Sequence, residues 1–187
     1  MDDSTDIVLG AKKFAHEKHK NQKTRNGIRP YSDHLEGVVS RLKNLGITDK
    51  SVLCAAWLHD ILEDTDVDFD QINERFGREV AVTVLSLTKD RNFPKKDRET
   101  HYINQLKDAT LHEKIIKLCD IADNLKDLSN APISQTQKNK QVKKIMHHLR
   151  VIKNDIIGNR SVYPKIQEIL EGVNIICVKF KQNPILI

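Results

Sequence analysis

Apolar side chains recur along this chain at the spacing of one helix face, and no run alternates with the two-residue period of a strand. Glycines such as Gly46 and Gly77 follow the apolar segments, as is common at helix ends. The pattern predicts helices over 6–20, 34–45, 50–63, 68–76, 78–88, 95–109, 111–129, 134–157 and 161–177. We therefore expect an all-α protein.

One predicted helix begins as an almost wholly apolar run, Leu53 to Thr65, and ends in ionisable groups. These groups are His59, Asp60, Glu63 and Asp64. Residues four apart share a helix face, so His59 should lie over Glu63 and Asp60 over Asp64. Charges avoid interiors unless they are paired or bound to a metal, and carboxylates are unfavourable at the negative end of a helix. The stretch favours a cation site over a helix end that simply emerges into solvent.

A second segment, 111–129, is apolar on most of its circumference, which is typical of a buried helix. Asp120 lies inside it, and Asn124 and Asp127 follow on the same face. A buried carboxylate needs a partner because desolvating the bare charge is costly. The partner could be Lys117 one turn away, a hydrogen-bond network or a metal, and the segment alone does not choose among them.

The loop 21–30 is indicated by its Asn, Gly and Pro content. Three cations lie in it: Lys23, Arg25 and Arg29. His34 opens the helix that follows, and Asp33 is expected to cap it with Glu36 in a capping box. A histidine at the head of an apolar stripe is more often a hydrogen-bonded core residue than a ligand. Whether His34 is a metal ligand therefore depends on which other side chains the fold places near it.

Composition limits the class of protein. The chain has 187 residues, 39% hydrophobic and 30% charged, which suits one soluble domain with a full-sized core. The N-terminus lacks the layout of a signal peptide, and no apolar run reaches membrane-spanning length. Cys54, Cys119 and Cys177 are interpreted as reduced core residues. We expect a cytoplasmic protein with no membrane partner, whose net charge of +5 mildly favours anionic ligands.

The helix over 134–157 is strongly basic, with no acidic residue between Ser129 and Asn154. We interpret its cations as a solvated face and expect no specific nucleic-acid partner, because no aromatic residues or nucleic-acid motif accompany them. His147 and His148 are expected to face solvent on the same helix.

Four groups remain as candidate ligands: His34, His59, Asp60 and Asp120. Two imidazoles and two carboxylates suit a divalent metal such as manganese, iron or zinc, with open positions for water and substrate oxygens. The three segments are far apart in sequence, so spacing alone makes this a moderate signal.

The order of several motifs along the chain supports this candidate metal site. They are His19-x-x-Gln22, Arg25-x-Gly27, Pro30-Tyr31-x-x-His34, Ala55-Ala56-x-Leu58-His59-Asp60-x-x-Glu63-Asp64-Thr65, Phe76-Gly77-x-x-Val80-Ala81, Leu87-Thr88-Lys89 and Ile116-Lys117-Leu118-Cys119-Asp120-x-x-x-Asn124-Leu125. The sequence resembles the HD-domain metal-dependent phosphohydrolases, and more narrowly the hydrolase domain of the RelA/SpoT alarmone enzymes and their small free-standing relatives. It departs from that pattern at Thr24-Arg25, where the family commonly has Arg-Lys, and at Leu35, where many members have Pro. The spacing between Gly27 and Pro30 is one residue longer than in the long bifunctional enzymes, although some small bacterial relatives share it.

The resemblance implies an HD-domain helical bundle: one hydrolase domain over 1–187, with a motif-bearing core at about 6–130 and C-terminal helices at about 134–177. It implies one Mn²⁺, or alternatively Fe, Co or Zn. It implies these roles: metal ligands His34, His59, Asp60 and Asp120; water handling by Glu63 and Asp64; nucleotide contact by Asn124; and phosphate contacts by Lys23, Arg25 and Lys89.

The reaction that the resemblance implies removes the 3′-pyrophosphate of guanosine 3′,5′-bis(diphosphate), ppGpp, to give GDP and pyrophosphate. Two alternatives stay open: an HD nucleotidase acting on another phosphate ester, and a non-catalytic HD module that binds nucleotide. The retention of Glu63 and Asp64 beside the ligand set argues against the non-catalytic module, because a sensor has no need of residues that handle water. The sequence does not predict the oligomeric state.

Overall fold

The computed structural model describes residues 6–24 and 27–185. The helices in these ranges are α1 (Ile7–Lys18), α2 (Tyr31–Asn44), α3 (Lys50–Leu58), α4 (Ile61–Asp64), α5 (Phe69–Phe76), α6 (Arg78–Leu87), α7 (Arg98–Asp108), α8 (Leu111–Asn130), α9 (Gln135–Gly158) and α10 (Ile166–Lys179). The only extended pairing in the same ranges is an isolated bridge between Lys23 and Pro30. The predicted all-α class is confirmed.

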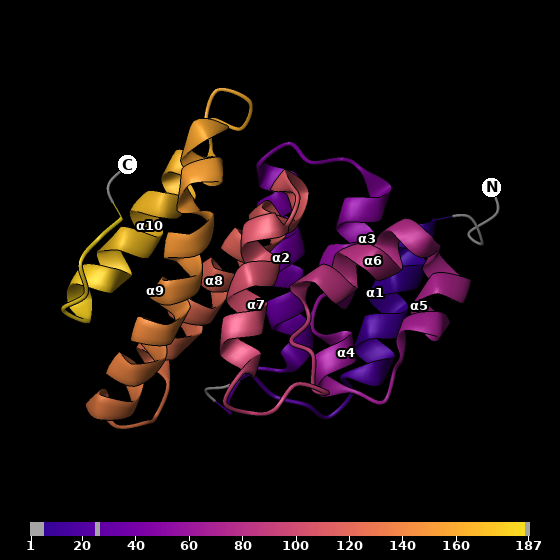
Figure 1. The fold of residues 1–187 in the computed structure, drawn as a ribbon, viewed down its shortest axis with the longest axis horizontal. Coiled ribbons are helices and arrows are strands. Elements are labelled where there is room, and N and C mark those ends of the chain that lie inside the picture. The colour runs from indigo at the N-terminus through magenta and orange to yellow at the C-terminus, as the bar shows by residue number, and fades with distance from the viewer. Residues whose placement is uncertain (1–5, 25–26, 186–187) are drawn as a thin grey trace.

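Two buried helices organise the packing. Helix α8 contacts α2, α9 and α10, and α3 contacts α1, α2 and α6. Figure 1 shows α9 and α10 along one side of the molecule, α1 and α5 toward the other, and α2, α7 and α8 between them. Leu35 of α2, Trp57 of α3 and Ile116 of α8 are almost fully buried in one hydrophobic core. The metal-ligand candidates therefore lie on, or next to, the most deeply buried elements.

The prediction of one continuous helix over 50–63 is wrong, because the structure has two helices there with a turn between them. Helix α3 ends at Leu58, a turn holds His59 and Asp60, and the short α4 follows. Three carboxylates beyond Leu58 disfavour continuation of a helix whose negative end they would face. The break places the histidine and the first aspartate on a turn instead of on one helix face.

The predicted capping of α2 is also wrong. The helix begins at Tyr31 after the N-cap Pro30, which makes no side-chain capping bond. The Glu36 carboxylate instead accepts from Lys12 Nζ at 2.6 Å. Proline fixes its own backbone in a conformation suited to the entry of a helix, so no polar cap is required. His34 consequently lies one turn inside α2.

The other helix limits agree with the predicted ones within a few residues, and α10 differs most. It begins at Ile166 instead of 161 because Pro164 disfavours a helical conformation at the residue before it. All three cysteines are free and buried. Among the described residues, no helix combines the length and apolarity that crossing a membrane requires.

Candidate metal centre

Four side chains from three separate segments meet in the interior. His34 comes from α2, His59 and Asp60 from the turn after α3, and Asp120 from the middle of α8. One potential ligand atom from each lies within 4.8 Å of all the others. His34, His59 and Asp120 are each less than 5% exposed, so the cluster is largely shielded from water. All four sequence-predicted ligands are thus brought together.

Both imidazoles present Nε2 to this cluster. His59 Nδ1 lies 2.8 Å from the carbonyl oxygen of Ala56, and His34 Nδ1 lies 2.9 Å from Asp123 Oδ2. A carbonyl and an ionised carboxylate only accept hydrogen bonds, so each Nδ1 carries the proton. Each Nε2 is therefore the ring atom suited to bind a metal, and the two lie 3.4 Å apart.

Asp60 is held in place by Tyr31, whose Oη donates to Asp60 Oδ2 at 2.5 Å. The same oxygen lies 3.1 Å from His59 Nε2. Burial and the nearby carboxylates raise the pKa of Tyr31, so the phenol keeps its proton and stays a donor. Tyr31 belongs to a quoted motif but had no predicted role.

The buried carboxylate of Asp120 has several partners. Its Oδ2 accepts from Lys117 Nζ at 2.8 Å, and its Oδ1 accepts from Asn124 Nδ2. The same Oδ1 lies 3.4 Å from His34 Nε2. One oxygen is therefore paired with a lysine while the other faces the two histidines, so an ion pair and a ligand role are compatible.

Charge compensation inside the cluster is strong. Burial lowers the pKa of His59, but Asp60 and Asp120 outweigh that effect and raise it to about 9. Burial likewise acts against a raised pKa at His34, yet Asp120, Asp123 and Asp60 move it well above the ordinary value. The pKa of Asp120 lies well below its usual range because Lys117 and the histidines outweigh burial. The carboxylates thus favour positive charge at the position the four groups surround.

The two predicted water-handling carboxylates flank this cluster and line its cavity. Glu63 Oε1 accepts from the backbone N–H of Lys89 at 2.6 Å, and Asp64 Oδ2 lies 3.2 Å from Tyr31 Oη. Burial raises the pKa of Glu63, although the Lys89 amide acts in the opposite direction. A carboxylate with a raised pKa accepts a proton more readily near neutral pH.

The side chains of the motif His19-x-x-Gln22 contact Tyr31 and the backbone of Asp64. The His19 ring stacks on Tyr31 with centroids 4.6 Å apart, and His19 Nδ1 lies 2.8 Å from Gln22 Oε1. Gln22 Nε2 in turn donates to the backbone carbonyl of Asp64 at 2.9 Å. Side chains from α1 and the following loop therefore fix the positions of Tyr31 and Asp64.

Three of the four ligand candidates, His34, Asp60 and Asp120, line a cavity of about 520 Å³. Of the predicted substrate-binding residues, Lys23, Lys89 and Asn124 line it, whereas Arg25 lies outside the described residues. Lys117 and Lys144 add cations to the lining of the same cavity. A cleft of this size with several cations is suited to a small polyanionic ligand.

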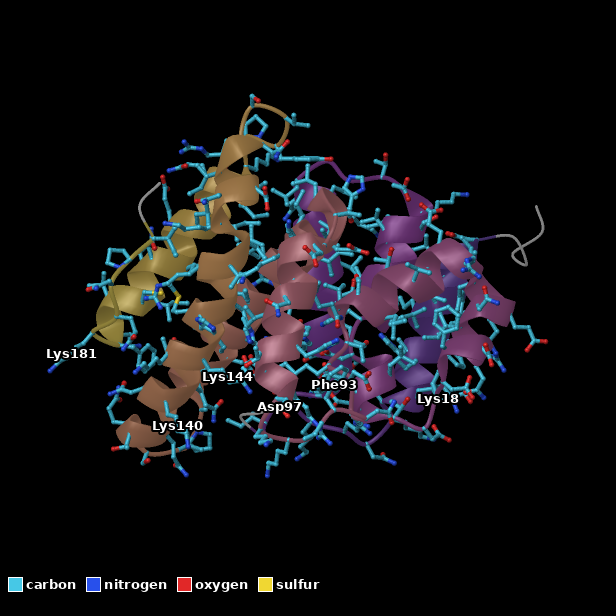
Figure 2. The ribbon with its side chains drawn as sticks, in the orientation of Figure 1. Lys18, Phe93, Asp97, Lys140, Lys144 and Lys181 are labelled. Atoms are coloured by element: carbon cyan, nitrogen blue, oxygen red, sulfur yellow. The ribbon has the colours of Figure 1, made fainter. Side chains whose placement is uncertain are left out.

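Helix α9 contributes to this cleft, which corrects two predictions. Its basic surface is not only a solvated face, because Lys144 lines the cavity. His148 was expected to face solvent but is buried, with Nε2 2.5 Å from Glu99 Oε1. Packing of α9 against α7 covers it. Figure 2 shows Lys140 and Lys144 on the part of α9 nearest Asp97 and Phe93, beside the start of α7.

Three side chains of the cavity lining meet at Glu99, namely Lys89, Lys144 and His148. We call these four residues the Glu99 cluster, and their end of the cleft the outer end. Glu99 Oε2 lies 3.2 Å from Lys89 Nζ and 3.5 Å from Lys144 Nζ. Although burial raises it, the pKa of Glu99 falls to about 2 because His148 and the lysines stabilise the carboxylate. Sequence reasoning missed Glu99, because its partners lie on α9 and in the segment between α6 and α7.

Asp123 was also missed. It is 1% exposed, and its carboxylate contacts His34 and two arginines. Its signal was available: a second carboxylate in the buried helix, one turn beyond Asp120. The predicted Asp127, by contrast, pairs with Arg29 at 3.2 Å and lines the cavity.

Comparison with known proteins agrees with this geometry. The sequence profile of the family described as HD domain matches residues 11–151. A MESH1 protein of Danio rerio, named guanosine-3′,5′-bis(diphosphate) 3′-pyrophosphohydrolase, is 33% identical over 170 residues, covering 90% of this chain and 92% of the relative. The MESH1 protein of Xenopus tropicalis, with the same name, is 38% identical over 130 residues, covering 68% and 73%.

A solved structure is similar as well. It is that of a metazoan orthologue of SpoT described as hydrolysing ppGpp, with a TM-score of 0.76 and 28% identity over 88% of this chain and 94% of that one. An all-helical fold with a buried His/Asp cluster is typical of HD-domain proteins, and the chain belongs to the HD-domain family. Within that family it is related to the MESH1 and SpoT-type ppGpp hydrolases.

Proposed function

We propose that this protein is a metal-dependent hydrolase that removes the 3′-pyrophosphate of ppGpp and releases GDP and pyrophosphate. The carrying observation is the juxtaposition of a His/Asp ligand cluster, two adjacent carboxylates and several cations around one cavity. The names of the MESH1 relatives support the choice of substrate. The family profile ends within α9, but α10 packs on α8, so we treat 1–187 as one domain.

The proposed metal ligands are His34, His59, Asp60 and Asp120. The fit rests on the donor set: two imidazole nitrogens with both Nδ1 atoms already engaged, and two carboxylates. This set suits Mn²⁺, our first choice, and also Fe²⁺, Co²⁺ or Zn²⁺. When bound, such a metal supplies Lewis-acid activation of water and stabilises charge on phosphate oxygens.

Glu63 and Asp64 are proposed to handle the proton of the attacking water. In the balanced reaction, the water oxygen forms a bond to the phosphorus next to the ribose 3′-oxygen. The bond from that phosphorus to the 3′-oxygen breaks, and a proton passes to the departing oxygen. Glu63 suits the accepting role because burial raises its pKa, while Tyr31 orients Asp64.

The phosphate groups are assigned to the cationic wall of the cavity. Lys23 and Lys89 line it from two different loops, and Asn124 reaches it from α8. Arg25 is proposed to act with Lys23 because it shares the same loop. Bringing several cations to one wall offsets repulsion between a polyphosphate and the carboxylates of the site.

The direct test is product analysis with ppGpp and added Mn²⁺, followed by Fe²⁺, Co²⁺ and Zn²⁺. We expect GDP and pyrophosphate in equal amounts, and loss of turnover after chelation. Asp66→Asn is the matched control, because Asp66 is an exposed carboxylate beside the acidic pair that lies outside the cavity lining. Its activity should equal that of the wild type.

A panel of other nucleotides distinguishes the alternatives. Faster release of orthophosphate from another nucleotide than of pyrophosphate from ppGpp would make the protein a different HD nucleotidase. Binding of ppGpp with no turnover in the presence of any of the four metals would mean that the protein is a non-catalytic module that binds nucleotide.

A further inference from the structure

The Asp123 carboxylate is buried at the junction of α2, α8 and the loop before α2. Its Oδ2 lies 2.9 Å from His34 Nδ1 and 3.0 Å from Arg29 Nη2. Its Oδ1 lies 2.8 Å from Arg41 Nη1. Both oxygens are engaged by donors, and two guanidinium groups keep the carboxylate ionised.

These contacts determine which nitrogen of His34 is available. An ionised carboxylate only accepts, so it keeps a proton on Nδ1 and leaves Nε2 as the ring nitrogen that faces His59 and Asp120. A carboxylate behind a metal-binding imidazole also increases the basicity of that ligand. The Nδ1 of His59 instead meets the neutral Ala56 carbonyl, so the two histidines differ in the charge of the group behind them.

The same carboxylate ties down the loop that carries Lys23. The backbone N–H of Thr24 donates to the Arg29 carbonyl at 2.9 Å, which closes the loop. The Arg29 side chain then reaches across to Asp123 and, at 3.2 Å, to Asp127 on α8. One buried carboxylate therefore contacts both a candidate metal ligand and the base of a candidate phosphate-binding loop.

We propose that Asp123 is a positioning residue that holds His34 in the metal-binding tautomer and orientation, and couples this ligand to the loop before α2. The inference rests on the metal site of the proposed function. It adds to that site a residue that does not touch the metal but sets its affinity.

Gly37 gives an independent way to displace this carboxylate. A Cβ at Gly37 would lie 2.5 Å from Asp123 Oδ1 and 3.1 Å from its Cγ. Gly37 lies inside α2, where alanine ordinarily favours a helix over glycine. Gly37→Ala should therefore move the Asp123 carboxylate even though it adds helix propensity.

The test is calorimetric titration of metal-free protein with Mn²⁺ alone. We expect Asp123→Asn to weaken binding by about 10- to 100-fold, because an amide lacks the charge that orients and polarises His34. The matched control is Glu36→Gln, which removes an exposed carboxylate of α2 that pairs with Lys12 and lies outside the cavity lining. Its Mn²⁺ affinity should stay within about threefold of the wild type.

Gly37→Ala should also weaken Mn²⁺ binding, by about tenfold. Its control is Gly172→Ala in α10, where a Cβ would meet nothing within 4 Å. That control should bind Mn²⁺ as the wild type does. Circular dichroism in a chelator checks that each variant is folded, and Gly37→Ala decides the question if Asp123→Asn does not fold.

The outcomes separate this inference from the proposed function. Wild-type Mn²⁺ affinity in folded Asp123→Asn overturns the role of Asp123 while the proposed hydrolase stands. Wild-type affinity in Gly37→Ala overturns it too. A wild-type protein that binds none of the four divalent metals overturns the metal site itself, and the inference with it.

Discussion

The two ends of the cleft are built on different physical principles. At the inner end, His34, His59 and Asp120 are buried, and each has fixed polar partners. At the outer end, the Glu99 cluster holds lysines that are partly exposed, and one carboxylate serves all of them. Charges interact strongly in a buried site and weakly where water and salt screen them.

This difference separates two tasks. The inner end can control protonation and geometry, because few arrangements of its groups are allowed. The outer end can attract and retain an anion without defining its position closely. Substitutions at the inner end should therefore affect chemistry and metal content, whereas those at the outer end should affect substrate affinity.

The largest effect is expected for Asp120→Ala. Removing this carboxylate leaves the partly buried Lys117 and two histidines without their shared partner. We expect loss of bound metal and a fall in ppGpp turnover of about 10³-fold or more, since Lewis-acid activation supplies several kcal/mol. Elemental analysis of purified protein measures the bound metal, and the rise in melting temperature on adding Mn²⁺ gives a second measure of metal binding. Equal metal content in wild type and variant would remove Asp120 from the ligand set.

Glu63→Gln should separate chemistry from metal binding within the inner end. The amide keeps the shape of the side chain but removes the base, which costs about 10²- to 10⁴-fold in rate. Mn²⁺ and ppGpp binding should persist by calorimetry, and Asp64→Asn should behave alike. Loss of metal in both variants would make these residues ligands, and full activity in both would end the case for general-base roles.

The outer end should be sensitive to acid through His148. Burial and the neighbouring Lys117 and Lys89 lower its pKa to about 4, whereas the unfolded value is 6.5. The unfolded state therefore binds more protons between these values, so stability falls as the pH drops from 6.5 to 4. The free energy of unfolding should fall by about 2 kcal/mol more over this range in the wild type than in His148→Gln.

Denaturant titrations at several pH values measure this difference. His147→Gln is the control, because His147 is the exposed neighbour on the same helix. Its stability should follow the wild-type pH dependence. Parallel curves for the wild type and His148→Gln would show that His148 is not held in its neutral form.

The smallest effect is expected for Lys144→Met. Partly exposed pairs contribute about 0.2–1 kcal/mol, so the KM for ppGpp should rise about two- to fivefold with kcat nearly unchanged. The difference should shrink as salt is added. Lys153→Met removes the same charge from α9 away from the cleft lining and should change neither constant. A fall in kcat for Lys144→Met would mean that the outer end takes part in chemistry.

The sequence was informative where local chemistry is unusual. A buried helix that contains Asp120, and an apolar run that ends in His59 and Asp60, are conspicuous without any tertiary information. The break after Leu58 was not predicted, because periodicity does not register a turn of two residues. The cap of α2 was misassigned because proline can start a helix without a polar side chain.

The remaining site residues depend on packing. Glu99 and His148 are 49 positions apart and meet only because α7 lies against α9. Asp123 acquires its role from Arg29 and His34, which come from another segment. The contact between Glu99 and His148 joins groups that look ordinary in isolation, so no local pattern distinguishes them from solvated charges, whereas Asp123 was signalled by its place in the buried helix but its partners were not.

The position of α8 between α2 on one side and α9 and α10 on the other has a consequence for fragment design. A fragment cut near residue 130 would retain every quoted motif and every candidate metal ligand. It would also uncover the apolar side chains of α8 that the last two helices shield, and remove Lys144 and His148 from the cleft. The stretch that carries the signature is therefore shorter than the stretch that buries α8.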